Sequence, residues 1–145
     1  MKFTDTAPTL PRPDGPPPWL GKLAKDATLE GAILKRSVHG RDNILTLISY
    51  ARTLYEFQEY TYYGNWDDNF FMEAYRSRIN GVPVDCFIVA HMNDKGEADS
   101  ILLHHYPLNA TLEFSRLMWE KFGDRFGDLY LSTTQADGVA RASNT

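Results

Sequence analysis

Three ionisable residues stand among apolar neighbours in this sequence and could carry proton-transfer chemistry. Asp85 lies in the apolar run 82–90, Glu73 in the preceding stretch FFMEAYRSRING, and His105 in DSILLHHYPL. A carboxyl group in apolar surroundings must be hydrogen-bonded, paired or protonated, because burying an unpaired charge is very costly. A protonated acid can donate a hydrogen bond to a ligand oxygen, an ionised acid can act as a base, and an imidazole with a pKa of about 6.5 suits proton transfer.

Each of these residues also has a purely structural interpretation, which stays open. Asp85 follows a turn that contains glycine and proline, and its side chain could do no more than cap that turn. A lone histidine in a core is more often structural than catalytic. His91 and His104 are weaker candidates than His105, because strand ends and outer faces are wetter.

Side-chain alternation in the strand that follows Phe70 separates an inner from an outer face. Arg76 and Arg78 share one face, and two arginines are expensive to bury. We therefore expect the other face, with Glu73, Tyr75 and Ser77, to point into the protein.

The next two strands are harder to orient. The run 82–92 is apolar on both faces near its middle, so we expect a central strand that is covered on both sides. In the last strand a histidine points inward whichever face is buried, and we favour His105 over His104.

The remaining elements predict an α+β fold of one domain. Six of the eight prolines fall within the first 18 residues, so we expect an extended arm over 1–18, a single domain over 19–133 and a flexible tail over 134–145. The expected elements of the domain are a short helical segment at Trp19, a strand over 26–34, a helix over 43–55 capped by Asp42 or Asn43, strands over 56–63, 70–81, 82–92 and 99–108, a turn over 64–69, a helix over 111–122 capped by Asn109 and ended by Gly123, and an edge segment over 126–132.

Composition excludes several classes of protein. The net charge is −4, with no basic stripe that would predict nucleic-acid binding. The first 20 residues lack the apolar core of a signal peptide, and no apolar run is long enough to span a membrane, so we expect a cytoplasmic protein. The one cysteine, Cys86, lies in an apolar strand and is expected to be a buried, inert thiol.

We expect neither a metal ion nor an organic cofactor. His104 and His105 are adjacent, so in a strand they point to opposite faces and cannot chelate one ion together. The sequence contains no HExxH or CxxC spacing, no glycine-rich phosphate loop and no GxSxG.

Three stretches, in their order along the chain, resemble the nuclear transport factor two-like superfamily, in particular its SnoaL-like branch of polyketide cyclases and ketosteroid-isomerase relatives. They are KDATLEGAILKRSVHGRDNI, GVPVDCFIV followed by a DKG turn, and ILLHHYPL. The resemblance spans about residues 19 to 118. It implies a cone-shaped domain in which a curved, mixed or antiparallel sheet wraps around helices as a cystatin-like α+β barrel. Such a domain has one pocket that opens at an end, and it often forms a homodimer through the outer sheet face.

The resemblance also implies site residues. Asp85 matches the position at which ketosteroid isomerases hold a protonated aspartate in the oxyanion hole. On the same matching, the residues that face the pocket are Glu73, Tyr75, Ser77, Phe87 and His105.

Two departures argue against steroid isomerisation. The general-base aspartate of the isomerases falls at Gly31 here, and the long first helix with their tyrosine donor is replaced by the proline arm. The acid and the base must then be other pocket residues, and we expect Asp85 with His105 or Glu73.

We therefore expect a pocket for a small, apolar, oxygen-bearing molecule, such as a polyketide-like or terpenoid metabolite, and a proton-transfer reaction such as isomerisation, cyclisation or dehydration. Tyr75 would donate a hydrogen bond to the developing oxyanion. Trp19 and Tyr60 are further candidate ligand contacts, because the arm and the tyrosine-rich strand close the mouth of the cone. The alternatives are a non-catalytic ligand-binding or dimeric interaction module of the same fold, or a scaffold whose proline arm recruits a partner.

Overall fold

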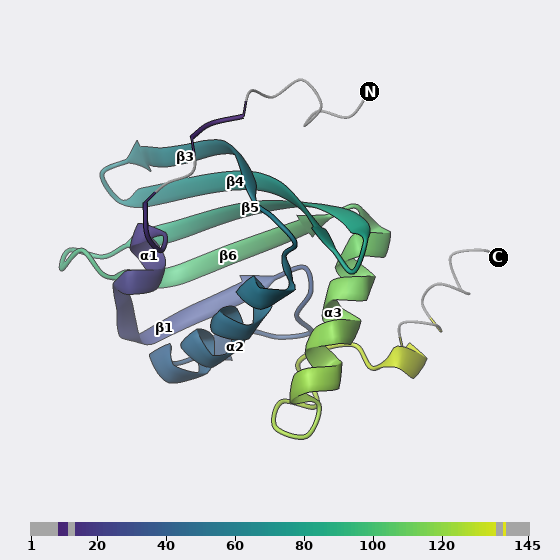
Figure 1. The fold of residues 1–145 in the computed structure, drawn as a ribbon. Helices are drawn as coiled ribbons and strands as arrows, with labels where there is room; N and C mark the ends of the chain where they lie inside the picture. Colours follow the sequence, from purple (N-terminus) through teal and green to yellow (C-terminus); the bar gives the residue numbers. More distant parts are fainter. Residues whose placement is uncertain (1–8, 12–13, 136–137, 139–145) are drawn as a thin grey trace.

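The computed structural model describes residues 9–11, 14–135 and 138, and these form an α+β fold around one curved sheet (Figure 1). The sheet has six strands in the order β2-β1-β6-β5-β4-β3. The elements are α1 (Pro18–Gly21), β1 (Leu23–Gly31), β2 (Val38–His39), α2 (Arg41–Leu54), β3 (Glu59–Asp67), β4 (Phe70–Ile79), β5 (Val82–Met92), β6 (Ala98–Tyr106) and α3 (Leu108–Phe122). Among the described residues, no helix is long and apolar enough to cross a membrane.

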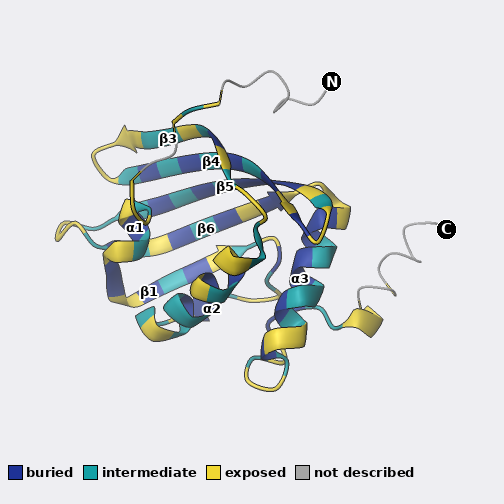
Figure 2. Ribbon diagram, viewed as in Figure 1, coloured by how far each residue is buried: buried dark blue, intermediate teal, exposed yellow. Residues whose placement is uncertain are grey.

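The sheet is mixed, one of the two arrangements that the resemblance implies, and is open at both edges. β1 and β6 run parallel, while the other neighbouring strands pair antiparallel. Figure 1 shows α2 and α3 against one face of the sheet, and Figure 2 shows that buried residues run along the strands.

The outer face of the sheet carries no helix in the described part of the chain, which differs from our expectation that β5 is covered on both sides. Met72, Phe87, Val89 and Leu102 lie there half-buried. The homodimer through this face stays a prediction.

The faces of β4 follow the arginine argument. Burial alternates along the strand, with Glu73, Tyr75 and Ser77 buried and Arg76 and Arg78 more exposed. The cost of burying two guanidinium groups therefore orients the strand correctly from sequence.

The expectation that Asp85 and Phe87 of β5 face the pocket is wrong, because the register of the strand differs by one residue. A two-residue turn, Asn80 and Gly81, joins β4 to β5, and both of its residues have positive φ angles, 50° and 76°. This is the geometry of a tight hairpin, which places Ile79 opposite Val82 and pairs each odd-numbered residue of β4 with an even-numbered residue of β5. Asp85 and Phe87 therefore point away from the helices.

Several element ends differ from the sequence-based expectation. α2 begins after Gly40 and α3 after Pro107, so the expected caps Asp42, Asn43 and Asn109 lie inside the first turns. Gly123 ends α3 as predicted. β1 starts and stops three residues earlier than expected, and the two-residue strand β2 was not predicted.

The strand β3 and the segment after α3 also differ. β3 continues to Asp67 through residues expected in a turn, and the Asp67 carboxylate accepts the backbone N–H groups of Asn69 and Phe70 to close a shorter turn. The segment 126–132 forms no strand, although Leu129 and Tyr130 are buried in the core.

The described part of the proline arm lies along β3. The Leu10 backbone N–H donates to the Tyr60 carbonyl at 2.7 Å, and the Tyr63 hydroxyl donates to the Pro11 carbonyl at 3.2 Å. Residues 1–8 and 12–13 of the arm, and most of the expected tail 134–145, lie outside the described residues.

Gly31 marks a close approach of β1 to β6. A Cβ atom at this position would lie 2.5 Å from the Leu103 carbonyl oxygen, which is backbone and cannot move aside without shifting β6. We expect Gly31→Ala to lower the free energy of unfolding by about 1–3 kcal/mol, the usual cost of overpacking.

The control for this prediction is Gly21→Ala, because no atom lies within 4 Å of the added Cβ there. Urea unfolding followed by circular dichroism measures both variants. Equal stabilities for the two would contradict the close approach of β1 to β6.

Candidate functional site

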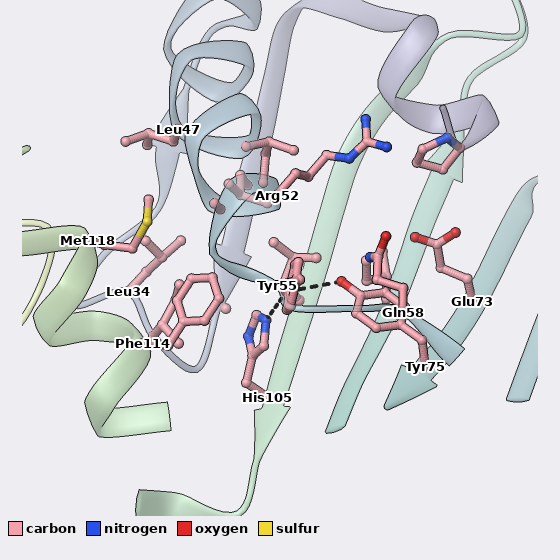
Figure 3. A pocket seen from close by; sticks show the side chains of 18 of the residues that line it. Leu34, Leu47, Arg52, Tyr55, Gln58, Glu73, Tyr75, His105, Phe114 and Met118 are labelled. Carbon is pink, nitrogen blue, oxygen red and sulfur yellow. Dashed lines mark hydrogen bonds between the residues drawn. The ribbon is translucent and has the colours of Figure 1, made fainter. Parts of the chain in front are cut away.

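A pocket lies between the inner face of the sheet and the helices α2 and α3 (Figure 3). The space between its atoms is about 620 Å³ with the open solvent at its mouth counted in, but only about 40 Å³ of it is free for the centre of a water molecule, and apolar side chains make most of its wall. Leu47 and Ile48 of α2 and Phe114 and Met118 of α3 line one side of it. These helices contribute because their 3.6-residue apolar periodicity turns one face of each toward the sheet.

Glu73 is the buried acid of this pocket. It stands on β4 with only 3% of its surface exposed, and it lines the pocket wall. The indole Nε1 of Trp19, from α1, donates to its Oε1 at 3.4 Å. Burial raises the pKa of the Glu73 carboxyl from 4.5 to about 7, while the Trp19 hydrogen bond and the charge of Arg52 oppose this rise. Glu73 can therefore both take up and release a proton near neutral pH.

A chain of hydrogen bonds crosses the pocket from β4 to β6. The hydroxyl of Tyr75 donates to that of Tyr55 at 3.1 Å, and the Tyr55 hydroxyl lies 2.8 Å from Nε2 of His105 (Figure 3). Burial raises the pKa values of both tyrosines well above 10, so both hydroxyls keep their protons at neutral pH.

His105 is a neutral member of this chain. It is buried, and its ring stacks on Phe114 with centroids 4.7 Å apart. Burial, together with a smaller repulsion from His104, lowers the pKa of the imidazole to about 4. Its Nδ1 is buried and finds no hydrogen-bond partner among the described residues. At neutral pH His105 therefore holds Tyr55 in place and carries no charge.

Cys86 is buried on the inner face between Tyr75 and His105, its neighbours in the register. Burial raises the pKa of its thiol to about 12. The expectation of a buried thiol is confirmed, and at this pKa the sulfur stays protonated and unreactive.

The structure brings five of the eight predicted site residues to the pocket: Trp19, Tyr60, Glu73, Tyr75 and His105. Ser77 is on the same face but does not line the pocket, and its hydroxyl donates to the Phe57 carbonyl.

Asp85 and Phe87 are not at the pocket, because the register of β5 turns them to the outer face. Asp85 is 6% exposed and lies opposite Arg76 and Tyr106 of the neighbouring strands. The match of Asp85 to the oxyanion-hole position of the isomerases is therefore not reproduced in space.

Sequence reasoning missed three polar residues of the pocket: Arg52, Tyr55 and Gln58. Arg52 lies in the last turn of α2, and Tyr55 is the extended residue that follows the helix. The usable signal for Arg52 was its spacing of four residues from the apolar Ile48, because residues four apart on a helix are neighbours.

Gly31 lines the pocket but offers no room for a side chain, since its missing Cβ would collide with the Leu103 carbonyl. The position that the sequence resemblance matches to a general base therefore has no space for a side chain in this protein. Among residues 9–11, 14–135 and 138, no group of three His, Cys, Asp or Glu side chains could hold a metal ion.

Solved structures show what this chain is similar to. A steroid delta-isomerase from Pseudomonas aeruginosa superposes with a TM-score of 0.67 at 12% identity, over 74% of this chain and 80% of that one. A protein with a cystatin-like fold from Silicibacter pomeroyi gives 0.66 at 11% identity, over 76% and 82%. A de novo designed protein with a curved β-sheet gives 0.54 at 15% identity, over 67% and 78%.

No protein-family model and no curated protein matches the sequence. The likeness is one of fold, and it confirms the expected α+β fold with a curved sheet, which is described as cystatin-like in one of these structures.

The shifted pKa values of Glu73 and His105 predict opposite dependences of stability on pH. Between pH 4.5 and about 7 the folded protein keeps a proton on Glu73 that the unfolded chain releases, so this contribution to stability is lost as the pH rises. Between pH 6.5 and about 4 the unfolded chain protonates His105 while the folded protein does not, so that contribution is lost as the pH falls.

We expect Glu73→Gln, which keeps a carbonyl acceptor for Trp19, to gain stability relative to the wild type as the pH rises from 4.5 to 7, by about 3 kcal/mol at most. His105→Gln should gain stability relative to the wild type as the pH falls from 6.5 to 4. Urea unfolding at a series of pH values measures both differences, and differences that do not change with pH would contradict these pKa values.

Proposed function

We propose that this protein catalyses proton transfer on a small, apolar, oxygen-bearing molecule, with Glu73 as the group that takes and returns the proton. The observation that carries this proposal is a carboxyl group, 3% exposed and with a pKa of about 7, in the wall of an apolar pocket. A base is most effective when its pKa is close to the working pH, and burial has brought Glu73 to that value.

In this proposal the ionised Glu73 removes a proton from carbon next to a carbonyl group and returns it at another position. The Trp19 indole orients the carboxylate by its hydrogen bond. Negative charge then develops on the carbonyl oxygen, and the hydroxyl of Tyr75 turns from Tyr55 to donate to that oxygen. His105 accepts from Tyr55 and so keeps the two tyrosines in line.

Two further points support an isomerisation, cyclisation or dehydration of a polyketide-like or terpenoid substrate. The pocket wall is mostly apolar, which suits a substrate with few polar groups. One solved structure of similar fold is described as a steroid delta-isomerase, an enzyme that moves a double bond. Asp85 has no part in the proposed reaction, because it lies on the other face of the sheet.

We expect Glu73→Gln to lower kcat/KM by at least about 100-fold on β,γ-unsaturated ketones, the usual contribution of a general acid–base group. The wild-type rate should rise with pH up to about 7 and then level off, because the ionised carboxylate is the active form. Conversion to the conjugated ketone, followed by ultraviolet absorbance, measures both.

The comparison variant is Asp85→Asn, which should keep the wild-type rate. If Asp85→Asn loses the activity and Glu73→Gln retains it, the site lies at Asp85 and the proposal is wrong. Binding of the ketones without conversion in the wild type would instead favour the alternative of a non-catalytic ligand-binding module.

A further inference from the structure

Two polar side chains of the pocket have no hydrogen-bond partner in the described part of the protein. Arg52 stands in the last turn of α2, is exposed and lines the pocket, yet it takes part in no ion pair. Gln58 precedes β3, is half-buried and lines the same pocket, and its amide makes no hydrogen bond. Arg52 differs in this from five other described arginines, each of which forms an ion pair: Arg36, Arg41, Arg76, Arg78 and Arg116.

Arg52 marks the open end of the pocket, because its side chain is at once exposed and part of the pocket wall. Figure 3 shows this side chain reaching from α2 toward the side of the pocket on which the carboxyl group of Glu73 and the amide of Gln58 lie. The wall beyond them is mostly apolar and also holds the neutral Tyr55, Tyr75 and His105. Among the described residues, the pocket therefore has its one cationic group at the mouth and a mostly apolar interior.

Glu73 does not use the donors of Arg52. The two groups attract each other through space, but the carboxylate and the guanidinium form no ion pair within 4.0 Å, and the hydrogen bond that Glu73 accepts comes from Trp19. An arginine without a partner beside an apolar pocket is suited to an anionic group on the ligand, because its planar fork matches a carboxylate with two parallel hydrogen bonds.

We infer that the pocket takes amphipathic monocarboxylates, whose apolar body lies against α2, α3 and the sheet and whose carboxylate binds Arg52 and Gln58 at the mouth. A single charge is favoured over a phosphate dianion, since one arginine is the only cation that lines the pocket in the described chain and Glu73 adds negative charge nearby. This inference rests on the proposed function and names its substrate class: a carboxylic acid that also carries the reacting carbonyl group.

The test is calorimetric binding of matched pairs of ligands to the full chain. The carboxylates are octanoate, decanoate and 4-phenylbutyrate, and each is compared with the alcohol of the same carbon skeleton. The wild type should bind the carboxylate of each pair more tightly, by about tenfold. Arg52→Gln should weaken carboxylate binding by about 10- to 100-fold, the range of a hydrogen bond to a charged group, and leave alcohol binding unchanged within about twofold.

Two further variants sharpen the result. Arg52→Lys should restore part of the preference, because it keeps the charge and loses the fork. Arg125→Gln is the matched control, since Arg125 is also a described arginine without an ion pair but stacks on Phe126 away from the pocket, and it should bind every ligand as the wild type does.

Three outcomes would overturn the inference: no preference for the carboxylates in the wild type, an equal loss of carboxylate and alcohol binding in Arg52→Gln, or no binding by any carboxylate of the series. The measurement reads affinity and needs no turnover. If the protein isomerises ketones but binds carboxylates no more tightly than alcohols, this inference alone is wrong. If it prefers carboxylates but Glu73→Gln isomerises ketones as fast as the wild type, the proposed function alone is wrong.

Discussion

The register between β4 and β5 decides which side chains form the pocket, and a two-residue turn sets that register. Asn80 and Gly81 both adopt positive φ angles, so Ile79 pairs with Val82 and the pairing continues without a shift along both strands. Because side chains alternate with a period of two, a shift of one residue would exchange the two faces of β5. The turn thus places Cys86 and Ile88 beside Tyr75 and Glu73, and directs Asp85 outward.

The apolar wall of the pocket sets the protonation of the groups inside it. Burial disfavours the charged form of every group, so it raises the pKa of the Glu73 carboxyl and lowers that of the His105 imidazole. The hydrogen bond from Trp19 and the charge of Arg52 favour the carboxylate but do not cancel the effect of burial. Burial therefore makes the Glu73 carboxyl titrate near pH 7, and it keeps the His105 imidazole neutral at that pH.

The fold is shared with proteins of 11–15% sequence identity, and the likeness extends to the fold alone. Gly31 occupies the place of a general base in the resemblance, and the structure leaves no space for a side chain there. The acid of this pocket stands instead on β4, at Glu73. A shared fold therefore does not by itself determine which side chains line its pocket.

The sequence by itself determined the elements and the orientation of some of them. Apolar periodicity predicted α2 and α3, alternation predicted β4 to β6, and the cost of burying Arg76 and Arg78 turned Glu73 and Tyr75 inward. These are local properties, which depend on residues a few positions apart. Only the tertiary structure decided the face of β5, because the conformation of the turn at Asn80 and Gly81 sets its register with β4. The contact of Trp19 with Glu73 and the place of Arg52 at the mouth join residues far apart in the chain, which only the tertiary structure brings together.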